Sequence, residues 1–77
     1  MSNSQLNCLI ELMHLSEQNQ YVASISVAKR LHISKPSAHR LLDGLKERGF
    51  IEKLHYGAAS LTEAGKQTAV EMEEKAR

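Results

Sequence analysis

The chain has only one cysteine and no long apolar run. The first absence excludes an internal disulfide, and the second excludes a membrane-spanning helix. The single thiol, Cys8, cannot form an internal disulfide, and its place in an apolar segment predicts core packing rather than chemistry. No run approaches the roughly 20 residues that a membrane-spanning helix needs. An N-terminal signal-peptide pattern is also missing. The sequence therefore predicts a cytoplasmic protein without membrane contact.

The sequence patterns of enzymes and of metal sites are also missing. At 77 residues the chain is expected to form one domain, residues 1–77, without room for separate catalytic and substrate domains. No nucleophile–base set, phosphate-cradling glycine loop or pair of carboxylates on a rigid face is recognisable. No two of the four histidines are spaced four residues apart within one predicted helix, so no zinc site is expected. We predict no catalysis, no small-molecule substrate, no cofactor and no metal. The histidines are His14, His32, His39 and His55.

The net charge of +1 hides an uneven distribution along the chain. Residues 29–56 carry seven lysines and arginines against three acidic residues, a net charge of +4. The rest of the chain carries three basic residues against six glutamates, a net charge of −3. A basic stripe on a nearly neutral domain is the pattern expected of a protein that binds a polyanion. A polarised but solvated surface is the alternative interpretation.

The helical spacing of apolar residues in the segment 24–49 predicts two helices joined by a tight turn. The first helix covers about Ile25–Leu31 with Ser24 as its cap, and residues 32–34 form the turn. Ser34 caps the second helix through its side-chain oxygen, and Gly49 ends it. Pro36 is tolerated in the first turn, where its missing N–H costs little. The apolar face of the second helix consists of Ala38, Leu41, Leu42 and Leu45. Its other side carries Lys35, Ser37, His39, Arg40, Asp43 and Gly44.

The segment before this pair predicts a helix over Gln5–Glu17, capped by Ser2 or Ser4, followed by an extended piece at residues 21–23. The apolar residues of this first helix cover a broad face. A face of this width favours contact on two sides, one against the helix pair and one against a second copy of the chain. We therefore expect a homodimer. The face comprises Leu6, Leu9, Ile10, Leu12, Met13 and Leu15.

After Gly49 the apolar pattern changes to a period of two. This period predicts a strand over Phe50–His55, a turn at residues 56–58 and a second strand over Ala59–Leu61. A two-stranded ribbon is marginal alone, so it must lean on the helices. A last helix follows over Glu63–Lys75. Thr62 caps it, and Ala64, Ala69, Val70 and Met72 form its thin apolar side.

This order of elements is that of a winged helix-turn-helix. The predicted fold class is mainly α (α+β), with a three-helix core, a two-stranded β-ribbon wing and a C-terminal helix. In this arrangement the second helix of the pair enters the major groove of double-stranded DNA, and the ribbon lies over the phosphate backbone. The expected function is sequence-specific DNA binding by a transcriptional regulator.

Base reading then falls to the second helix. Arg40 can make a bidentate contact with guanine, and Ser37 and His39 can donate or accept hydrogen bonds. Lys35 and the N–H groups of the first turn can reach phosphate. On the ribbon, Lys53, His55 and Tyr56 suit phosphate and sugar contacts, which position a protein without reading sequence.

One run resembles a known family: VAKRLHISKPSAHRLLDGLKERGFIEKLHYGAASLTEAGKQTA. It is similar to the DNA-binding domain of the iron- and manganese-dependent repressors, the diphtheria toxin repressor family. The similarity covers about residues 9–70, and the multiple-antibiotic-resistance regulators share its weaker parts. Its features are VAKRL, a second helix that starts S-x-x-S, an L-x-x-x-G end, and LTEAG after the wing. The resemblance implies a bacterial repressor that binds its operator as a dimer. It places DNA contacts on the helix that starts at Ser34, at Lys35, Pro36, Ser37, His39 and Arg40.

Two features depart from that family. Its wing usually carries an arginine beside the glycine, whereas this chain has an alanine after Gly57 and a tyrosine before it. The first-helix positions of its metal ligands align with Asn7 and Ile10, which are a poor ligand and no ligand. The partner helix that supplies the other ligands is missing as well, so no metal sensing is expected.

A winged helix that serves as a protein-interaction module is the alternative. Such domains often lose the basic side chains of the second helix, and this chain keeps Lys35 and Arg40 there. DNA binding is therefore the favoured interpretation.

Overall fold

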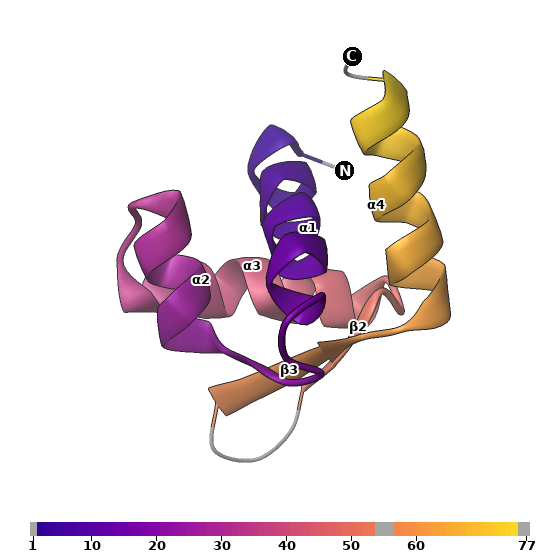
Figure 1. The fold of residues 1–77 in the computed structure, drawn as a ribbon. Helices are drawn as coiled ribbons and strands as arrows, with labels where there is room; N and C mark the ends of the chain where they lie inside the picture. Colours follow the sequence, from indigo (N-terminus) through magenta and orange to yellow (C-terminus); the bar gives the residue numbers. More distant parts are fainter. Residues whose placement is uncertain (1, 54–56, 76–77) are drawn as a thin grey trace.

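The structure is a computed structural model, and it describes residues 2–53 and 57–75. Four helices and a small sheet make up the described part of the chain, and the sheet lies at one edge of the helices (Figure 1). The elements are α1 (Asn3–Ser16), β1 (Val22–Ala23), α2 (Ser24–Leu31), α3 (Lys35–Glu47), β2 (Ile51–Lys53), β3 (Ala58–Leu61) and α4 (Glu63–Lys75). The predicted winged helix-turn-helix is confirmed, with one addition to its sheet.

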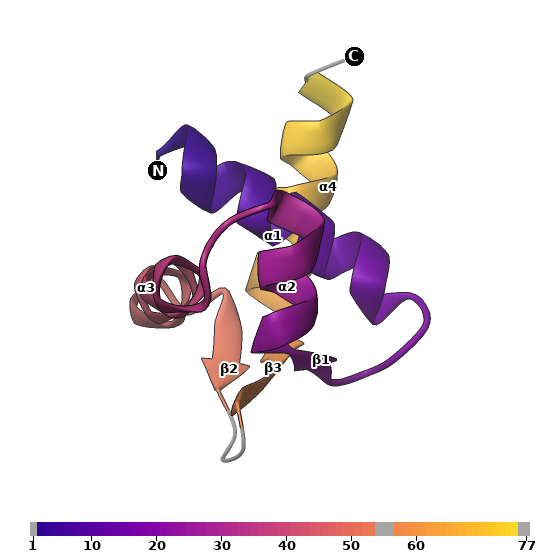
Figure 2. The same ribbon diagram turned by 90° about the vertical axis from the view of Figure 1, so that its left-hand side faces the viewer.

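The sheet has three antiparallel strands in the order β1-β3-β2, so the wing is not a free two-stranded ribbon. The residues before α2 supply the third strand, β1, which lies beside β3 (Figure 2). Val22 pairs with Ala59 and Ala23 with Ala58. On the other edge of β3, Ile51 pairs with Leu61. The sequence indicated an extended piece at residues 21–23, but its partner lies more than thirty residues away in the chain.

The core lies where α1 crosses the helix pair. Cys8, Leu9 and Leu12 of α1 are buried against residues of α2, α3 and the sheet. Burial raises the pKa of the Cys8 thiol to about 11, so the side chain stays a neutral packing group. The remaining buried hydrophobic residues of the cluster are Met13, Val22, Val27, Leu42, Leu45, Ile51, Ala59 and Ala69.

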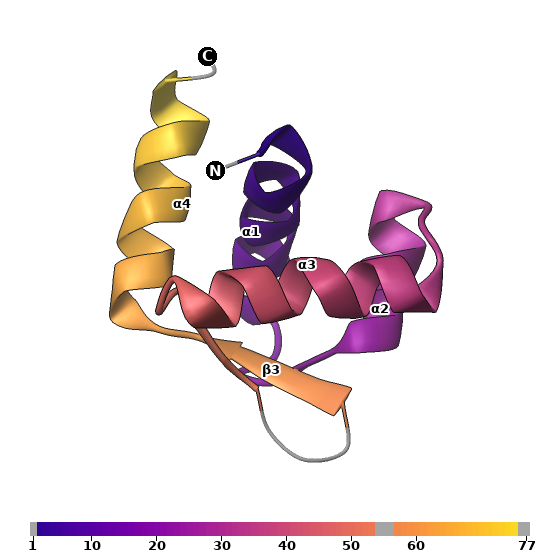
Figure 3. The same ribbon diagram turned by 180° about the vertical axis from the view of Figure 1, so that it is seen from behind.

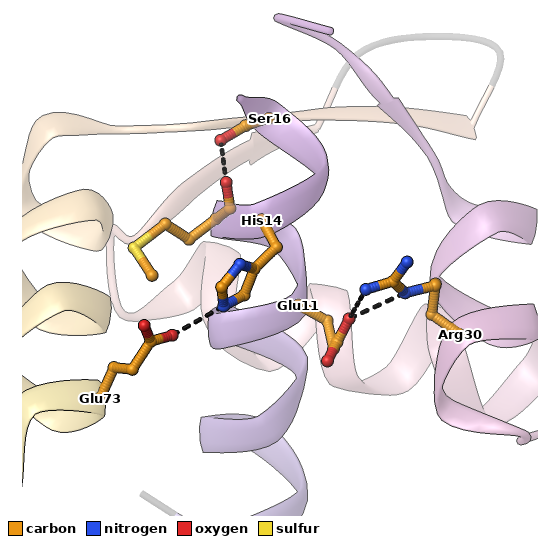
Figure 4. Close-up of polar contacts among 6 residues, drawn as sticks. Glu11, His14, Ser16, Arg30 and Glu73 are labelled. Atoms are coloured by element: carbon orange, nitrogen blue, oxygen red, sulfur yellow. Dashed lines mark hydrogen bonds and ion pairs between the residues drawn. The ribbon is translucent and has the colours of Figure 1, made fainter. Parts of the chain in front are cut away.

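The broad apolar face of α1 is covered within one chain. α1 packs on α2, α3 and α4, and it also touches β1 and β3. Two polar contacts tie α1 to its neighbours (Figure 4): His14 Nε2 lies 2.7 Å from Glu73 Oε2 of α4, and Arg30 Nη2 of α2 lies 2.9 Å from Glu11 Oε2. The width of this face therefore does not require a second copy of the chain.

Local signals set the start of α1. Gln5 N donates to Ser2 Oγ over 3.1 Å, and Ser2 N donates to Gln5 Oε1 over 3.2 Å, which is a reciprocal capping box. The cap of α2 differs from the prediction. Its cap is Ala23, without a side-chain hydrogen bond, and Ser24 is the buried first residue of the helix. The pairing of β1 places Ser24 against Gly57 of the wing instead.

The C-terminal helix α4 packs closely on the chain that leads into β2. Thr62 Oγ1 accepts from Gly65 N over 3.1 Å, which confirms the predicted cap, and donates to the Gly49 carbonyl over 2.7 Å. Gly65 is buried, and a Cβ there would overlap the Phe50 carbonyl oxygen. The predicted apolar side of α4 is partly wrong, because Ala64 and Val70 are exposed while Gly65 and Ala69 face the core.

Candidate nucleic-acid interface

The helix α3 runs across one outer face of the molecule (Figure 3). Its start follows from local chemistry: Ser37 N donates to Ser34 Oγ over 3.3 Å, and Pro36 lies in the first turn. Gly49, at a φ of 81°, follows the end of the helix. Ala38, Leu42 and Leu45 hold the inner face in the core. The opposite face is therefore fixed toward solvent.

Most of the predicted DNA-contacting residues of α3 and its cap are accessible. Four of them are exposed, and two are half-buried. The exposed residues are Ser34, Lys35, Pro36 and Arg40, and the half-buried ones are Ser37 and His39. The residues presented most directly outward share one stripe with the spacing of a helical face, formed by Pro36, Arg40, Asp43 and Glu47.

Two hollows in the surface border the first turns of α3. One, of about 340 Å³, lies between α3, the start of α2 and the wing, and Lys35 and His39 line it together with Gly57. The other, of about 530 Å³, lies between α3 and the start of α1, and Ser37 and Arg40 line it. The first half of α3 is thus a ridge between two depressions, with basic or hydrogen-bonding side chains on both flanks.

The first turn of α2 borders the wing-side hollow. Its N-cap is Ala23, which makes no side-chain hydrogen bond to the first turn. Ser24 and Ile25 of the first turn line the hollow with Lys35 of α3. The sequence could have revealed this start of α2 only if the pairing of β1 had been known, because Ser24 reads locally as a good cap.

Lys53, a predicted phosphate contact, forms an ion pair with an acidic side chain of α3. Its Nζ lies 2.6 Å from Asp43 Oδ1 of α3, and its side chain is only 21% exposed. The hydrogen bond from Lys53 holds the pKa of the Asp43 carboxyl below its ordinary value, and the positive charges of Lys53, His39 and Lys46 act in the same direction. Lys53 is therefore bound to the helix rather than extended toward solvent.

Two further predicted contacts, His55 and Tyr56, lie outside the described residues. In the part of the chain that the structure describes, Arg30 is held by Glu11, with Arg30 Nε donating to Glu11 Oε2 over 3.0 Å. Two of the seven cations in residues 29–56, Arg30 and Lys53, are thus paired with acidic side chains. Across residues 2–53 and 57–75, no group of three or more His, Cys, Asp or Glu side chains is placed to hold a metal.

The profile of one family, the IclR helix-turn-helix domain, matches residues 12–55. The comparison with curated proteins found no match. Among solved structures, ZitR from Lactococcus lactis is similar with a TM-score of 0.76 and 22% identity, over 96% of this chain and 51% of that one. MepR, a transcription regulator from Staphylococcus aureus, gives a TM-score of 0.77 and 23% identity, over 99% of this chain and 62% of that one. MarR from E. coli in its reduced form gives a TM-score of 0.74 and 18% identity, over 96% of this chain and 52% of that one.

These likenesses bear on the fold, and the chain spans about half the length of ZitR and of MarR. They confirm the weaker expected likeness to multiple-antibiotic-resistance regulators, whereas the likeness to the diphtheria toxin repressor family is not confirmed. The reason lies in the residues that carried it. In LTEAG, Thr62 caps α4 and Gly65 allows α4 to approach Phe50, so this motif meets a packing need of the winged fold.

No helix among the described residues is both long enough and apolar enough to cross a membrane.

Proposed function

Because the chain belongs to the IclR helix-turn-helix domain family, a DNA-binding domain, we propose that it recognises an operator for a bacterial transcriptional regulator of repressor type. In this proposal α3 lies in the major groove. We further propose that residues 1–77 act as one DNA-binding domain and that the protein is cytoplasmic. No catalytic role is proposed, since the matched family is a helix-turn-helix domain and the similar MepR is a transcription regulator.

One observation carries this proposal: the first half of α3 is a ridge with a hollow on each side. A helix with its side chains is about 10–12 Å across, and the major groove is about 12 Å wide. A helix that fills the groove needs free space on both flanks, because the two phosphate backbones rise there. The hollows supply this space on the flank of the wing and on the flank of α1.

The side chains divide into base-reading and positioning groups. Arg40 stands on the outward stripe, where its guanidinium can make a bidentate contact with guanine. Ser37 and His39 can donate or accept beside it. Lys35 of α3 lines the wing-side hollow together with the first turn of α2, so it suits a phosphate backbone on that flank. Ser34 and Pro36 start the helix and bring its first turn to the groove.

We propose that two copies occupy one operator. A single α3 reaches only a few base pairs, and helix-turn-helix proteins extend the site by placing two recognition helices about one helical turn apart. The proposed homodimer therefore predicts an operator with two-fold symmetry.

The test is selection of bound duplexes from a random pool, followed by affinity measurements on the selected site. Arg40→Ala should lose about 1–3 kcal/mol on that site and relax the preference at one base pair. Arg48→Ala is the matched control, because it removes the same charge from an exposed position at the other end of the helix. It should lower affinity for all sequences alike.

Equal losses in both variants would reject the groove assignment. A parent chain with no salt-dependent affinity for any duplex would reject DNA binding and favour the protein-interaction alternative, because phosphate binding makes log K fall by about 0.9 per contact with log salt.

A further inference from the structure

Among the seven cations of residues 29–56, Lys53 has an unexpected environment. It lies on β2 beside α3, where a basic side chain is expected to reach phosphate. Its ammonium instead lies 2.6 Å from Asp43 Oδ1, and its side chain is 21% exposed against 60% for Asp43. The anion is thus the accessible member of the pair, and the cation is the covered one.

Asp43 also occupies the outward stripe of α3, at helical spacing from Arg40 and Glu47. A carboxylate there faces the groove that the proposed function assigns to DNA. Its other charged neighbours are His39 and Lys46 on its own helix, so it stays ionised at neutral pH. A phosphate that approached Lys53 would meet this negative charge first.

We propose that Asp43 sequesters Lys53 and thereby limits the sequence-independent part of DNA affinity. For Lys53 to bind a phosphate, the chain must first give up the pair with Asp43 and bring two anions together. One phosphate contact is therefore suppressed, and base contacts at Arg40 supply a larger share of the binding energy. This inference rests on the proposed function, and it makes Asp43 a positioning residue that acts through Lys53.

The test is a double-mutant cycle read as the slope of log K against log salt on a random-sequence duplex. Asp43→Asn should bind about 2- to 5-fold tighter at low salt, the factor that corresponds to an exposed ion pair. Its slope should be steeper by about 0.9, one extra phosphate contact. Lys53→Met should change the parent slope little and remove the added slope from Asp43→Asn.

Glu47→Gln is the matched control. It removes one negative charge from the same stripe, one turn further on, and among the described residues Glu47 has no ion pair. Any gain in affinity from this variant reflects net charge alone, so Lys53→Met should have the same small effect with Glu47→Gln as in the parent. NMR titration of Asp43 in the free chain provides a DNA-independent readout: the carboxyl pKa should rise in Lys53→Met.

Three outcomes would overturn the proposal. The first is that Asp43→Asn has the same slope of log K against log salt as the parent. The second is that Lys53→Met changes affinity equally in the parent, in Asp43→Asn and in Glu47→Gln. The third is that Lys53→Met leaves the pKa of Asp43 unchanged. If the parent binds no duplex at any salt concentration, the proposed function itself fails and this inference fails with it. A parent that binds DNA while the cycle shows no coupling rejects the role of Asp43 alone.

Discussion

At the residue scale, His32 has the least favourable backbone conformation among the residues that the structure describes. It ends α2 with φ 55° and ψ 44°, in the left-handed region, and it is the sole residue other than glycine with a positive φ in residues 2–53 and 57–75. Its N–H still bonds back to α2, and Ile33 N donates to Ala28 O over 3.0 Å. The hydrogen bonds of the turn thus hold His32 in a conformation that glycine adopts more easily.

His32→Gly should therefore stabilise the fold. The left-handed conformation costs a residue with a Cβ about 1–2 kcal/mol, and glycine removes this cost. The greater freedom of glycine in the unfolded chain offsets part of the resulting stabilisation. We expect a net increase of about 0.5–1 kcal/mol in the free energy of unfolding, measured by urea denaturation with an unchanged m-value. His32→Ala retains the Cβ and is the control. An equal gain in His32→Ala would show that the imidazole, not the backbone, is the source.

At the scale of elements, two helical glycines look alike in the sequence but have opposite surroundings. A Cβ on Gly65 would overlap the Phe50 carbonyl oxygen, which belongs to the backbone and cannot rotate away. A Cβ on Gly44 would overlap Gln5 Nε2, which is the end of a flexible side chain. The first glycine permits the packing of α4, whereas the second is replaceable.

Alanine substitutions should change stability in opposite directions at these two positions. Gly65→Ala should lower the free energy of unfolding by about 1–3 kcal/mol through overpacking. Gly44→Ala should raise it by up to about 1 kcal/mol, because alanine favours the helix and Gln5 can move. Thermal or urea unfolding of both variants measures the pair. If both variants lost a similar amount of stability, the contact between α1 and α3 would be packed as tightly as the contact between α4 and the turn before β2.

The elements that the sequence predicted well are those set by neighbours in the chain. Ser34 and Thr62 cap helices through contacts three residues away, and Gly49 ends α3 one residue past its cap. The apolar period likewise placed Ala38, Leu42 and Leu45 in the core. These features need no knowledge of the tertiary fold, because each depends on residues within one or two turns.

The features that the sequence left open depend on distant partners. Asp43 and Lys53 belong to different elements, and neither periodicity nor capping indicates that they meet. The pairing of β1 with β3 decided that Ala23, not Ser24, caps α2. The outward stripe of α3 was predictable, but the ion pair that holds Lys53 of β2 against Asp43 of that stripe was not.

At the scale of the whole molecule, the described surface has few large apolar side chains. Tyr21, Ile25 and Val70 are the large hydrophobic residues exposed within residues 2–53 and 57–75. Stable homodimer interfaces bury a large and strongly apolar area, and three exposed side chains supply little of it. The apolar face of α1, which suggested a dimer from the sequence, is covered by α2, α3 and α4.

The proposed homodimer should therefore form on DNA and not before it. We expect sedimentation equilibrium to give a monomer for the 77-residue chain at concentrations up to about 100 μM, since the described surface exposes few large apolar side chains. On the selected duplex, two copies should bind, with half-site centres about 10 base pairs apart. Changing that spacing by about 5 base pairs rotates one half-site to the opposite face of the duplex. If the two copies contact each other on DNA, this change should abolish cooperative binding and leave single-copy affinity intact. A single copy on a symmetric site, or a spacing change without effect, would exclude the dimer.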